Sequence, residues 1–199
     1  VVESKQKLNQ ILSEICTSIY PNTPKINMEL INKHKVSGAI NSARKSYFNR
    51  LVNNWNEKDL GYPEDKFPAD KTIYWSLIKN NGIHRIEDRN YVVTSPNSED
   101  ENFIRVWQEC ELFLQEAKKE QRPITDLINS LKQKPYKLKQ GIIDFLIPTF
   151  LFVRRGDFAL YNVDGGYMPY INETILYLTT RNPDEYSVKS FELDNLRLN

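Results

Sequence analysis

Glycine, cysteine and histidine are scarce in this chain of 199 residues, which has seven, two and two of them. Seven glycines are about half the usual share, which disfavours a glycine-turned β-sandwich and favours a helix-rich fold. No apolar run reaches the ~18 residues that a membrane-spanning helix needs. The first eight residues, VVESKQKL, lack the basic-then-apolar order of a signal peptide. We therefore expect a cytoplasmic fragment of a longer protein, from a low-GC bacterium, with no membrane partner.

The few cysteines and histidines exclude several chemistries. Cys16 and Cys110 each fall on the apolar side of an expected helix, where a cysteine is usually a small core residue. His34 and His84 are far apart and outside any zinc-ligand motif, so no metal site is predicted. The chain also lacks a P-loop and a G-x-G-x-x-G motif, and we predict no nucleotide or other cofactor.

Acidic residues gather near turns, but no cluster has a lysine and a second carboxylate at the spacing of a metal-dependent nuclease. Acidic residues in such places usually begin solvated helices. We therefore predict no catalytic residues and no small-molecule substrate, and the chain by itself is not expected to be an enzyme. The clusters are Glu64-Asp65, Glu87-Asp88, Glu99-Asp100-Glu101 and Asp184-Glu185.

Apolar side chains recur at three- and four-residue spacing in several segments, which predicts helices. The stripes include Leu8, Leu12, Ile15 and Ile19 in the first helix, and Val36, Ile40, Ala43, Tyr47 and Leu51 in a longer one. Extended segments on either side of turns predict two β-hairpins. The expected helices are 5–20, 26–33, 36–54, 71–80, 102–119, 124–132, 137–154 and 173–180; the hairpins pair 83–85 with 91–93 and 158–161 with 167–170; a strand covers 186–193.

Helices separated by a basic turn and followed by a hairpin are the components of a winged helix-turn-helix. Both halves of the chain show this order, without any residue-by-residue repeat. We predict a mainly α fold with small β-hairpins, arranged as tandem winged helix-turn-helix-like units. The first unit, with the N-terminal helix, covers residues 1–96 and the second covers residues 97–199.

Basic residues concentrate between Lys25 and Arg50, where six Lys and Arg accompany a single Glu in a chain of net charge +1. Lys and Arg bind phosphate oxygens, whereas Asn, Gln, Arg and Ser read base edges. This pattern predicts that the helix 36–54 and the turn before it contact duplex DNA. The alternative is an ordinary solvated helix face. The candidate nucleic-acid-binding residues are Lys33, Lys35, Asn41, Arg44, Lys45 and Asn49.

The helix expected at 137–154, in the position of a recognition helix in the second unit, is not suited to DNA contact. Apolar residues between Ile142 and Val153 lie around the whole circumference of this helix, which also contains Pro148, so the helix is expected to be buried. This favours a second hypothesis, in which the chain is a protein-docking or structural domain without direct DNA contact. Nearby lysines are interpreted as solvated, and tyrosines 136, 161, 167 and 170 as core or edge packing rather than base stacking.

Several segments resemble part of the very large bacterial P-loop ATPases of phage-defence systems, of the BREX phage-exclusion and phage-growth-limitation type. The resemblance implies a winged-helix portion of a multi-domain ATPase, whose nucleotide site lies elsewhere and whose other domains or subunits are its partners. No residue here matches the family's P-loop. The segments are TPKINMELIN (23–32), SGA (37–39), ARK (43–45), IY (73–74) through Leu77, GIHR (82–85), PITDLI (123–128), PYKLKQG (135–141) and LY (160–161) through Pro169.

Overall fold

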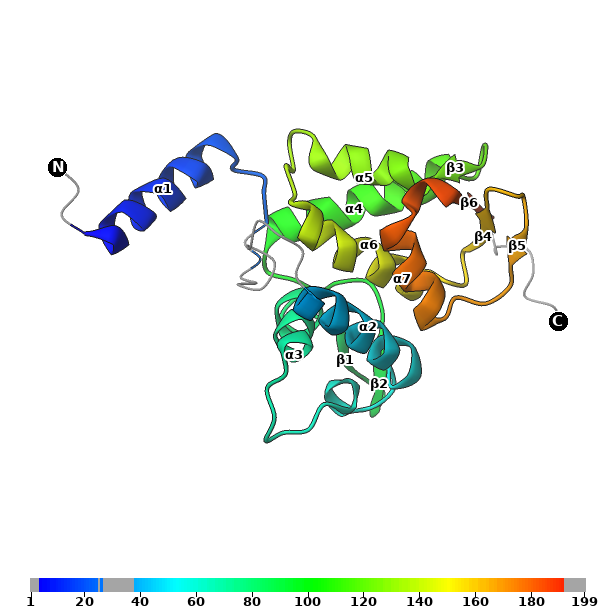
Figure 1. Cartoon of the computed structure of the whole chain (residues 1–199), viewed down its shortest axis with the longest axis horizontal. Helices are drawn as coiled ribbons and strands as arrows, with labels where there is room; N and C mark the ends of the chain where they lie inside the picture. Colours follow the sequence, from blue (N-terminus) through cyan, green and yellow to red (C-terminus); the bar gives the residue numbers. More distant parts are fainter. Residues whose placement is uncertain (1–3, 25, 27–37, 192–199) are drawn as a thin grey trace.

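Helices make up most of the chain in the computed structural model, which describes residues 4–24, 26 and 38–191 (Figure 1). Two small antiparallel sheets complete the fold, so the predicted mainly helical class is confirmed. The elements of the first half are α1 (Lys5–Ile19), α2 (Gly38–Asn53), η1 (Lys58–Gly61), α3 (Ala69–Ile73), η2 (Tyr74–Lys79), β1 (His84–Glu87) and β2 (Asn90–Val93). Those of the second half are α4 (Glu101–Glu116), β3 (Arg122–Pro123), α5 (Ile124–Lys132), α6 (Gln140–Val153), β4 (Phe158–Asn162), β5 (Tyr167–Met168), α7 (Glu173–Arg181), η3 (Pro183–Glu185) and β6 (Tyr186–Ser190).

The predicted helices agree with those observed to within a few residues at their ends. The helix expected at 26–33 lies outside the described residues apart from Ile26. The segment 71–80 is formed by α3 and the π-helical turn η2, which follow each other without a break. Periodic apolar spacing therefore identified these helices correctly.

Helix α6 is the centre of the hydrophobic core. Every residue from Ile142 to Phe152 is buried, as the apolar sequence predicted. A helix that is apolar on all sides needs neighbours on all sides, and α6 contacts α2, α4, α5 and α7. Figure 1 shows α4 and α5 on one side of α6, and α2 on the other.

Helix α2 buries the face that its sequence predicted. Ile40, Ala43, Tyr47 and Leu51 are all buried, whereas Val36 lies outside the described residues. The rings of Tyr47 and Phe145 meet edge to face with centroids 5.5 Å apart, a favoured aromatic geometry. Through such contacts the buried side chains of both halves form one continuous core cluster.

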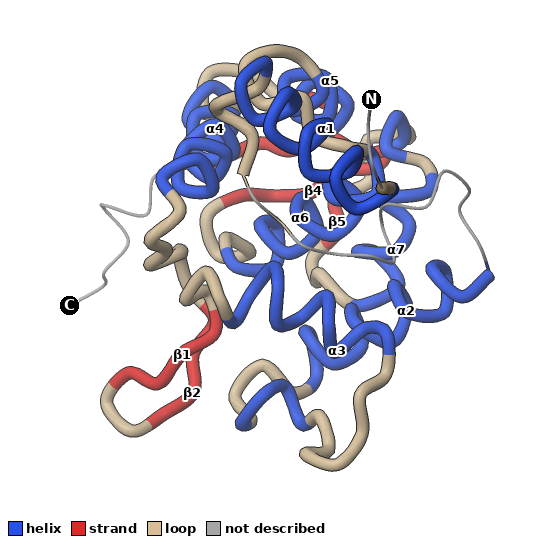
Figure 2. The backbone as a smooth tube through the Cα atoms, turned by 90° about the vertical axis from the view of Figure 1, so that its left-hand side faces the viewer, coloured by secondary structure: helices blue, strands red, loops and turns tan. Residues whose placement is uncertain are grey.

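The hairpin of β1 and β2 has a two-residue loop. Glu87 pairs with Asn90, which leaves Asp88 and Arg89 as the loop, with φ values of 48° and 70°. Positive φ at both central positions is the type I′ arrangement, whose twist matches that of the flanking strands. The predicted hairpin is confirmed, and Figure 2 shows it extending away from the helices.

The second sheet has the strand order β3-β6-β4-β5. The predicted β4–β5 hairpin is present, but its pairing is short, and the longest ladder joins β4 to β6 from Phe158–Ser190 to Asn162–Tyr186. Strand β3 was not predicted, because two residues carry no alternating pattern. Pro123 is compatible with this edge strand, where a missing N–H breaks no ladder.

We predict that the two halves unfold in one cooperative transition, because they share a core. Phe145→Ala should lower the free energy of unfolding by about 3–5 kcal/mol, the usual cost of deleting a buried ring. Urea unfolding is to be followed in variants that keep only Trp75 or only Trp107, which report on different halves. The exposed Tyr170→Ala is the control and should change stability by less than about 0.5 kcal/mol. Separate midpoints for Trp75 and Trp107 would contradict a shared cooperative core.

Candidate interaction surfaces

The predicted DNA-contacting face of α2 is only partly exposed. Lys45 and Asn49 lie at the surface, and Asn41 is half-buried. The ammonium of Lys45 lies 4.9 Å from the ring centroid of Tyr177 on α7, a cation–π contact. Lys33 and Lys35 lie outside the described residues.

Arg44, one of the predicted DNA-contacting residues, does not lie on this surface. Its side chain is 2% exposed, and Nη2 lies 2.6 Å from Oδ2 of Asp144 on α6. Nη1 also donates to the hydroxyl of Thr180 at 3.3 Å. Position 44 lies one helical turn from both Ile40 and Tyr47, on the buried side of α2, and Asp144 supplies the countercharge that makes burial of a guanidinium tolerable.

The Arg44–Asp144 pair joins α2 to α6 inside the core. Asp144 also accepts a hydrogen bond from Nε2 of Gln140 at 2.6 Å. Burial raises the pKa of Asp144, while Arg44 and Gln140 act in the opposite direction. A polar contact of this kind fixes the relative position of two helices because an unpaired charge here would be costly.

Arg50 is also engaged within the protein. Its Nη1 donates to the carbonyl of Gly61 at 2.9 Å, and its guanidinium lies 4.3 Å from the ring centroid of Tyr62. Among the described residues counted in the basic region, Lys45 is therefore the cation exposed to solvent. The sequence count overestimated the positive surface of α2, because charge counting does not detect internal pairing.

A partly buried polar cluster adjoins the β1–β2 hairpin. The Tyr74 hydroxyl donates to Oδ1 of Asp59 at 3.1 Å and lies 2.8 Å from Nδ1 of His84. Lys79 pairs with the same Asp59 oxygen at 2.5 Å. Burial lowers the pKa of His84. Burial opposes ionisation of Asp59, but hydrogen bonds from Lys79 and Tyr74 outweigh it and lower the pKa of that carboxyl.

His84 of this cluster packs between η2 and the hairpin. His84 is buried, and its ring centroid lies 5.3 Å from that of Tyr91 of β2 and 5.8 Å from that of Tyr74 of η2, so it contacts both the hairpin and η2. Within residues 4–24, 26 and 38–191, no group of three or more His, Cys, Asp or Glu is placed to hold a metal ion. Of the predicted acidic clusters, Asp100 caps the N-terminus of α4 and Glu64 pairs with Lys58.

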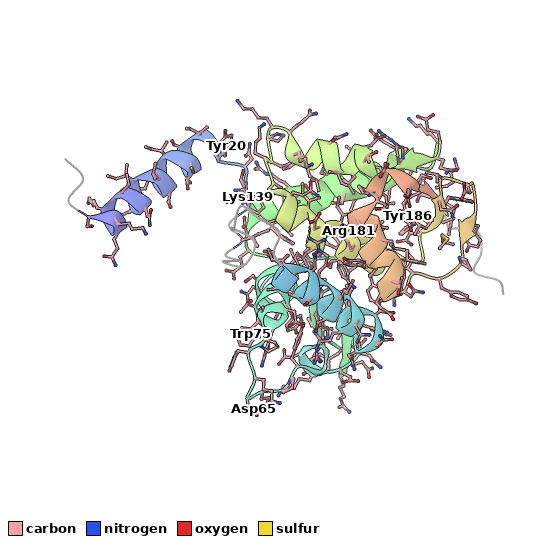
Figure 3. The ribbon with its side chains drawn as sticks, viewed as in Figure 1. Tyr20, Asp65, Trp75, Lys139, Arg181 and Tyr186 are labelled. Atoms are coloured by element: carbon pink, nitrogen blue, oxygen red, sulfur yellow. The ribbon has the colours of Figure 1, made fainter. Side chains whose placement is uncertain are left out.

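Helix α1 exposes its apolar stripe. The side chains of Leu8, Leu12, Ile15 and Ile19 are 41%, 49%, 46% and 56% exposed, and none of the residues of α1 is buried. The helix extends away from the rest of the chain, and its side chains stand clear of it (Figures 1 and 3). Cys16 is exposed as well, so the predicted core role is wrong for Cys16, whereas it is confirmed for the buried Cys110.

The segment after α1 is hydrogen-bonded to the body of the protein. Asn102 of α4 donates to the carbonyl of Pro21 at 2.7 Å, and Arg105 donates to Oδ1 of Asn22 at 3.1 Å. Thr23 donates to the carbonyl of Tyr136 at 2.5 Å. These contacts hold the C-terminal end of α1, while its stripe remains uncovered by the described residues.

Aromatic side chains are exposed around β5. Tyr167 and Tyr170 are exposed, the latter at 78%, so the packing interpretation does not hold for Tyr170. Tyr167 keeps a contact with Tyr161 across the hairpin, at a centroid distance of 5.9 Å, as edge packing requires. Tyr136 and Tyr161 are half-buried.

Two cavities of moderate size adjoin the loops. One of about 480 Å³ lies between the end of α1 and the start of α6, lined by residues such as Tyr20, Leu138 and Ile142. A more polar one of about 390 Å³ includes Asn81 and Asp100. Among the described helices, none has the length and apolar character that crossing a bilayer requires.

Comparison of the chain with protein-family models, with curated proteins and with solved structures yields no match.

Removing one partner of the buried ion pair should destabilise the protein strongly. Arg44→Ala leaves Asp144 unpaired in the core and should cost about 3–5 kcal/mol in the free energy of unfolding. The double substitution Arg44→Met with Asp144→Leu should recover most of that loss, because no charge then remains buried. Urea denaturation is the measurement, and the exposed neighbour Lys45→Ala is the control. A loss below about 1 kcal/mol for Arg44→Ala would show that the guanidinium is solvated.

Stability should fall as the pH drops below the ordinary histidine pKa of about 6.5. The unfolded chain then takes up a proton at His84 that the folded chain, with its lowered pKa, does not, so unfolding is favoured by up to about 1.4 kcal/mol per pH unit. The loss ends where the pH reaches the folded-state pKa. Protonation of Asp59 changes the free energy of unfolding only below about pH 4, because the pKa of this carboxyl is lowered in the folded protein.

His84→Asn keeps a hydrogen-bond donor near the position of Nδ1. It should reduce the dependence of the free energy of unfolding on pH, measured by urea denaturation between pH 4.5 and 7.5. An unchanged slope in His84→Asn would rule out His84 as the titrating group.

Proposed function

We propose that this chain is a non-catalytic protein-docking module of a larger assembly, and that α1 is its docking element. The observation that carries this proposal is the apolar stripe of α1, exposed on a helix with no buried residue. Isolated helices of about 12–15 residues are marginal in water, so α1 needs a partner to be fully stable. An apolar helix face is a common way to bind a partner protein.

The second half supports a scaffold role. Its order α4, β3, α5, α6, β4 and β6, with sheet order β3-β6-β4, supports the proposal of a winged-helix-like unit in which β5 and α7 are inserted between the last two strands. In such a unit α6 takes the position of the recognition helix. Because α6 is buried and contacted by α2 and α7, a winged-helix unit of this kind would organise the fold instead of reading a groove.

Membership of a bacterial defence ATPase rests on the resemblance of the sequence segments. In that setting the nucleotide site belongs to another part of the assembly, and this chain supplies docking contacts to other domains or subunits. Two tandem winged-helix-like units, divided near residue 96, remain part of this proposal.

Contact with duplex DNA through α2 is the second candidate function. Lys45 and Asn49 are exposed on one side of α2, together with Ser42 and Asn53, which is a composition suited to phosphate and base contacts. The engagement of Arg44 and Arg50 within the protein leaves this surface with fewer cations than the sequence indicated. Docking is therefore the better-supported function.

A photo-crosslinking amino acid placed on α1 of the whole protein, in the cells that produce it, tests docking. At Leu12, on the stripe, it should give specific protein adducts, because a docked partner covers this face. At Ser13, on the polar face, it should give none. Equal adduct formation at the two positions, or none at either, would refute docking through α1.

Contact with duplex DNA is tested with the purified protein. Fluorescence anisotropy with a labelled duplex at about 50 mM salt would detect even non-specific phosphate contacts. Binding that is weakened by Lys45→Glu with Asn49→Asp, but not by the distant control Lys66→Glu, would place the DNA hypothesis first. We expect no such selective loss.

A further inference from the structure

We infer that the occupant of the α1 stripe is α1 of a second copy of this chain, paired with it in the antiparallel direction. This inference rests on the proposed docking function and names its partner. It follows from the spacing of the stripe, from the charges along α1 and from the place where the body is attached.

The stripe has the spacing of a coiled-coil seam. Leu8, Leu12, Ile15 and Ile19 follow one another at intervals of four, three and four residues, which are alternating d and a positions of a heptad. Asn9 and Ser18 flank the seam and carry no charge, so two copies would meet without flanking like-charge repulsion. Ile11 and Cys16 extend the apolar width.

Lys5 argues against parallel pairing. It lies seven residues before Leu12, on the same seam, and is exposed. In a parallel pair each Lys5 would face the Lys5 of the partner subunit, and like charges in such positions are destabilising. In an antiparallel pair centred between Leu12 and Ile15, Lys5 lies beyond the end of the partner helix.

The antiparallel register gives matched apolar layers. Leu12 of one copy then lies opposite Ile15 of the other, and Leu8 lies opposite Ile19. Each layer combines one Leu with one Ile, so all four seam residues of each copy are covered. A helix of 15 residues is about 22 Å long, which accommodates these four layers and little more.

The lysines of α1 interact unfavourably with the dipole of their own helix and favourably with that of an antiparallel partner helix. Lys5 and Lys7 lie near the N-terminus of α1, which is the positive end of the helix dipole. The first turn of α1 contains no acidic residue, and its last turn contains no basic residue. This placement disfavours the lone helix. Antiparallel pairing brings the two lysines just beyond the C-terminal end of the other helix, near the negative end of its dipole.

The attachment of the body is compatible with the same direction. The body joins α1 at its C-terminal end, where Asn102 and Thr23 hold the connecting segment (Figure 1). Antiparallel helices place the two bodies at opposite ends of the pair. Parallel helices would bring both bodies to the same end, beside each other.

Sedimentation equilibrium of the purified chain tests the pairing. The wild type should pass from monomer to dimer as its concentration rises, with a dissociation constant in the micromolar range, since four short layers bury little area. Leu12→Glu with Ile15→Glu should remain monomeric at about 500 µM, at least ten times the wild-type dissociation constant. Gln6→Glu with Ser13→Glu adds the same charge to the polar face of α1 and should still dimerise.

A wild type that stays monomeric at about 500 µM would overturn the inference, and so would dimerisation of the stripe variant. Far-UV circular dichroism gives a second measurement, because pairing should increase helix content with concentration only in the chains that dimerise. Folding of the body is checked in every variant by its urea transition.

The direction is tested by disulfide formation with the native Cys16. In the antiparallel pair, residue 9 of one copy and Cys16 of the other flank the seam on the same side, so Asn9→Cys should give a disulfide-linked dimer under mild oxidation. Residues 9 and 16 of one helix are about 10.5 Å apart along its axis, too far for an internal disulfide. In a parallel pair residue 11 would instead approach Cys16 of the partner subunit. Crosslinking of Ile11→Cys without crosslinking of Asn9→Cys would refute the antiparallel direction.

Failure of this inference is distinguishable from failure of docking. If the chain is monomeric but Leu12 still gives face-specific photo-crosslinks to a different protein, self-pairing is refuted and docking stands. If Leu12 gives no face-specific adduct and the chain is monomeric, both are refuted.

Discussion

The buried ion pair between Arg44 and Asp144 joins α2 to α6 where the two halves of this protein meet. Helix α6 is apolar on nearly all sides and must be covered by neighbours, but apolar contacts alone do not specify which helix covers it or in which position. A guanidinium and a carboxylate, 2.6 Å apart in the core, tolerate only a narrow range of positions, because separation would leave both charges buried and unpaired. The contact therefore favours one position of α2 on α6 over others, in addition to the apolar packing that the two helices share.

Local sequence patterns predicted most helices and both hairpins because their determinants are local. Apolar spacing identified the buried face of α2 through Ile40 and Tyr47, and a polar turn between extended segments identified the β1–β2 loop at Asp88 and Arg89. The pairing of β4 with β6 was not predictable in this way, because the two strands are separated by α7 and their register depends on the packed sheet. The pairing of strands that are far apart in the sequence of the second half therefore became known only from the structure.

The candidate surfaces were less predictable, since a sequence shows which side chains are charged or apolar but not what they meet. Arg44 and Lys45 are neighbours with the same charge, yet one is buried against Asp144 and the other is exposed. The stripe of α1 has the same helical period as the stripe of α2, yet one remains exposed and the other forms core. One difference is visible in the sequence of α1. Lys5 and Lys7 lie at the positive end of the dipole of their own helix, which destabilises the isolated helix.

Separation of α1 from the core has a thermodynamic consequence. Because α1 contributes no buried residue, its helix–coil equilibrium can change without a cost to the α2–α6 interface. The hydrogen bonds at Pro21 and Thr23 hold these two residues against the body, so under the proposed docking the cost in conformational entropy falls mainly on the residues of α1 itself. The proposed docking through such a short helix would be weak and reversible, because part of the free energy of contact is used to form the helix. Contact strength then depends on how completely a partner covers the four seam side chains, while the fold of the body stays the same.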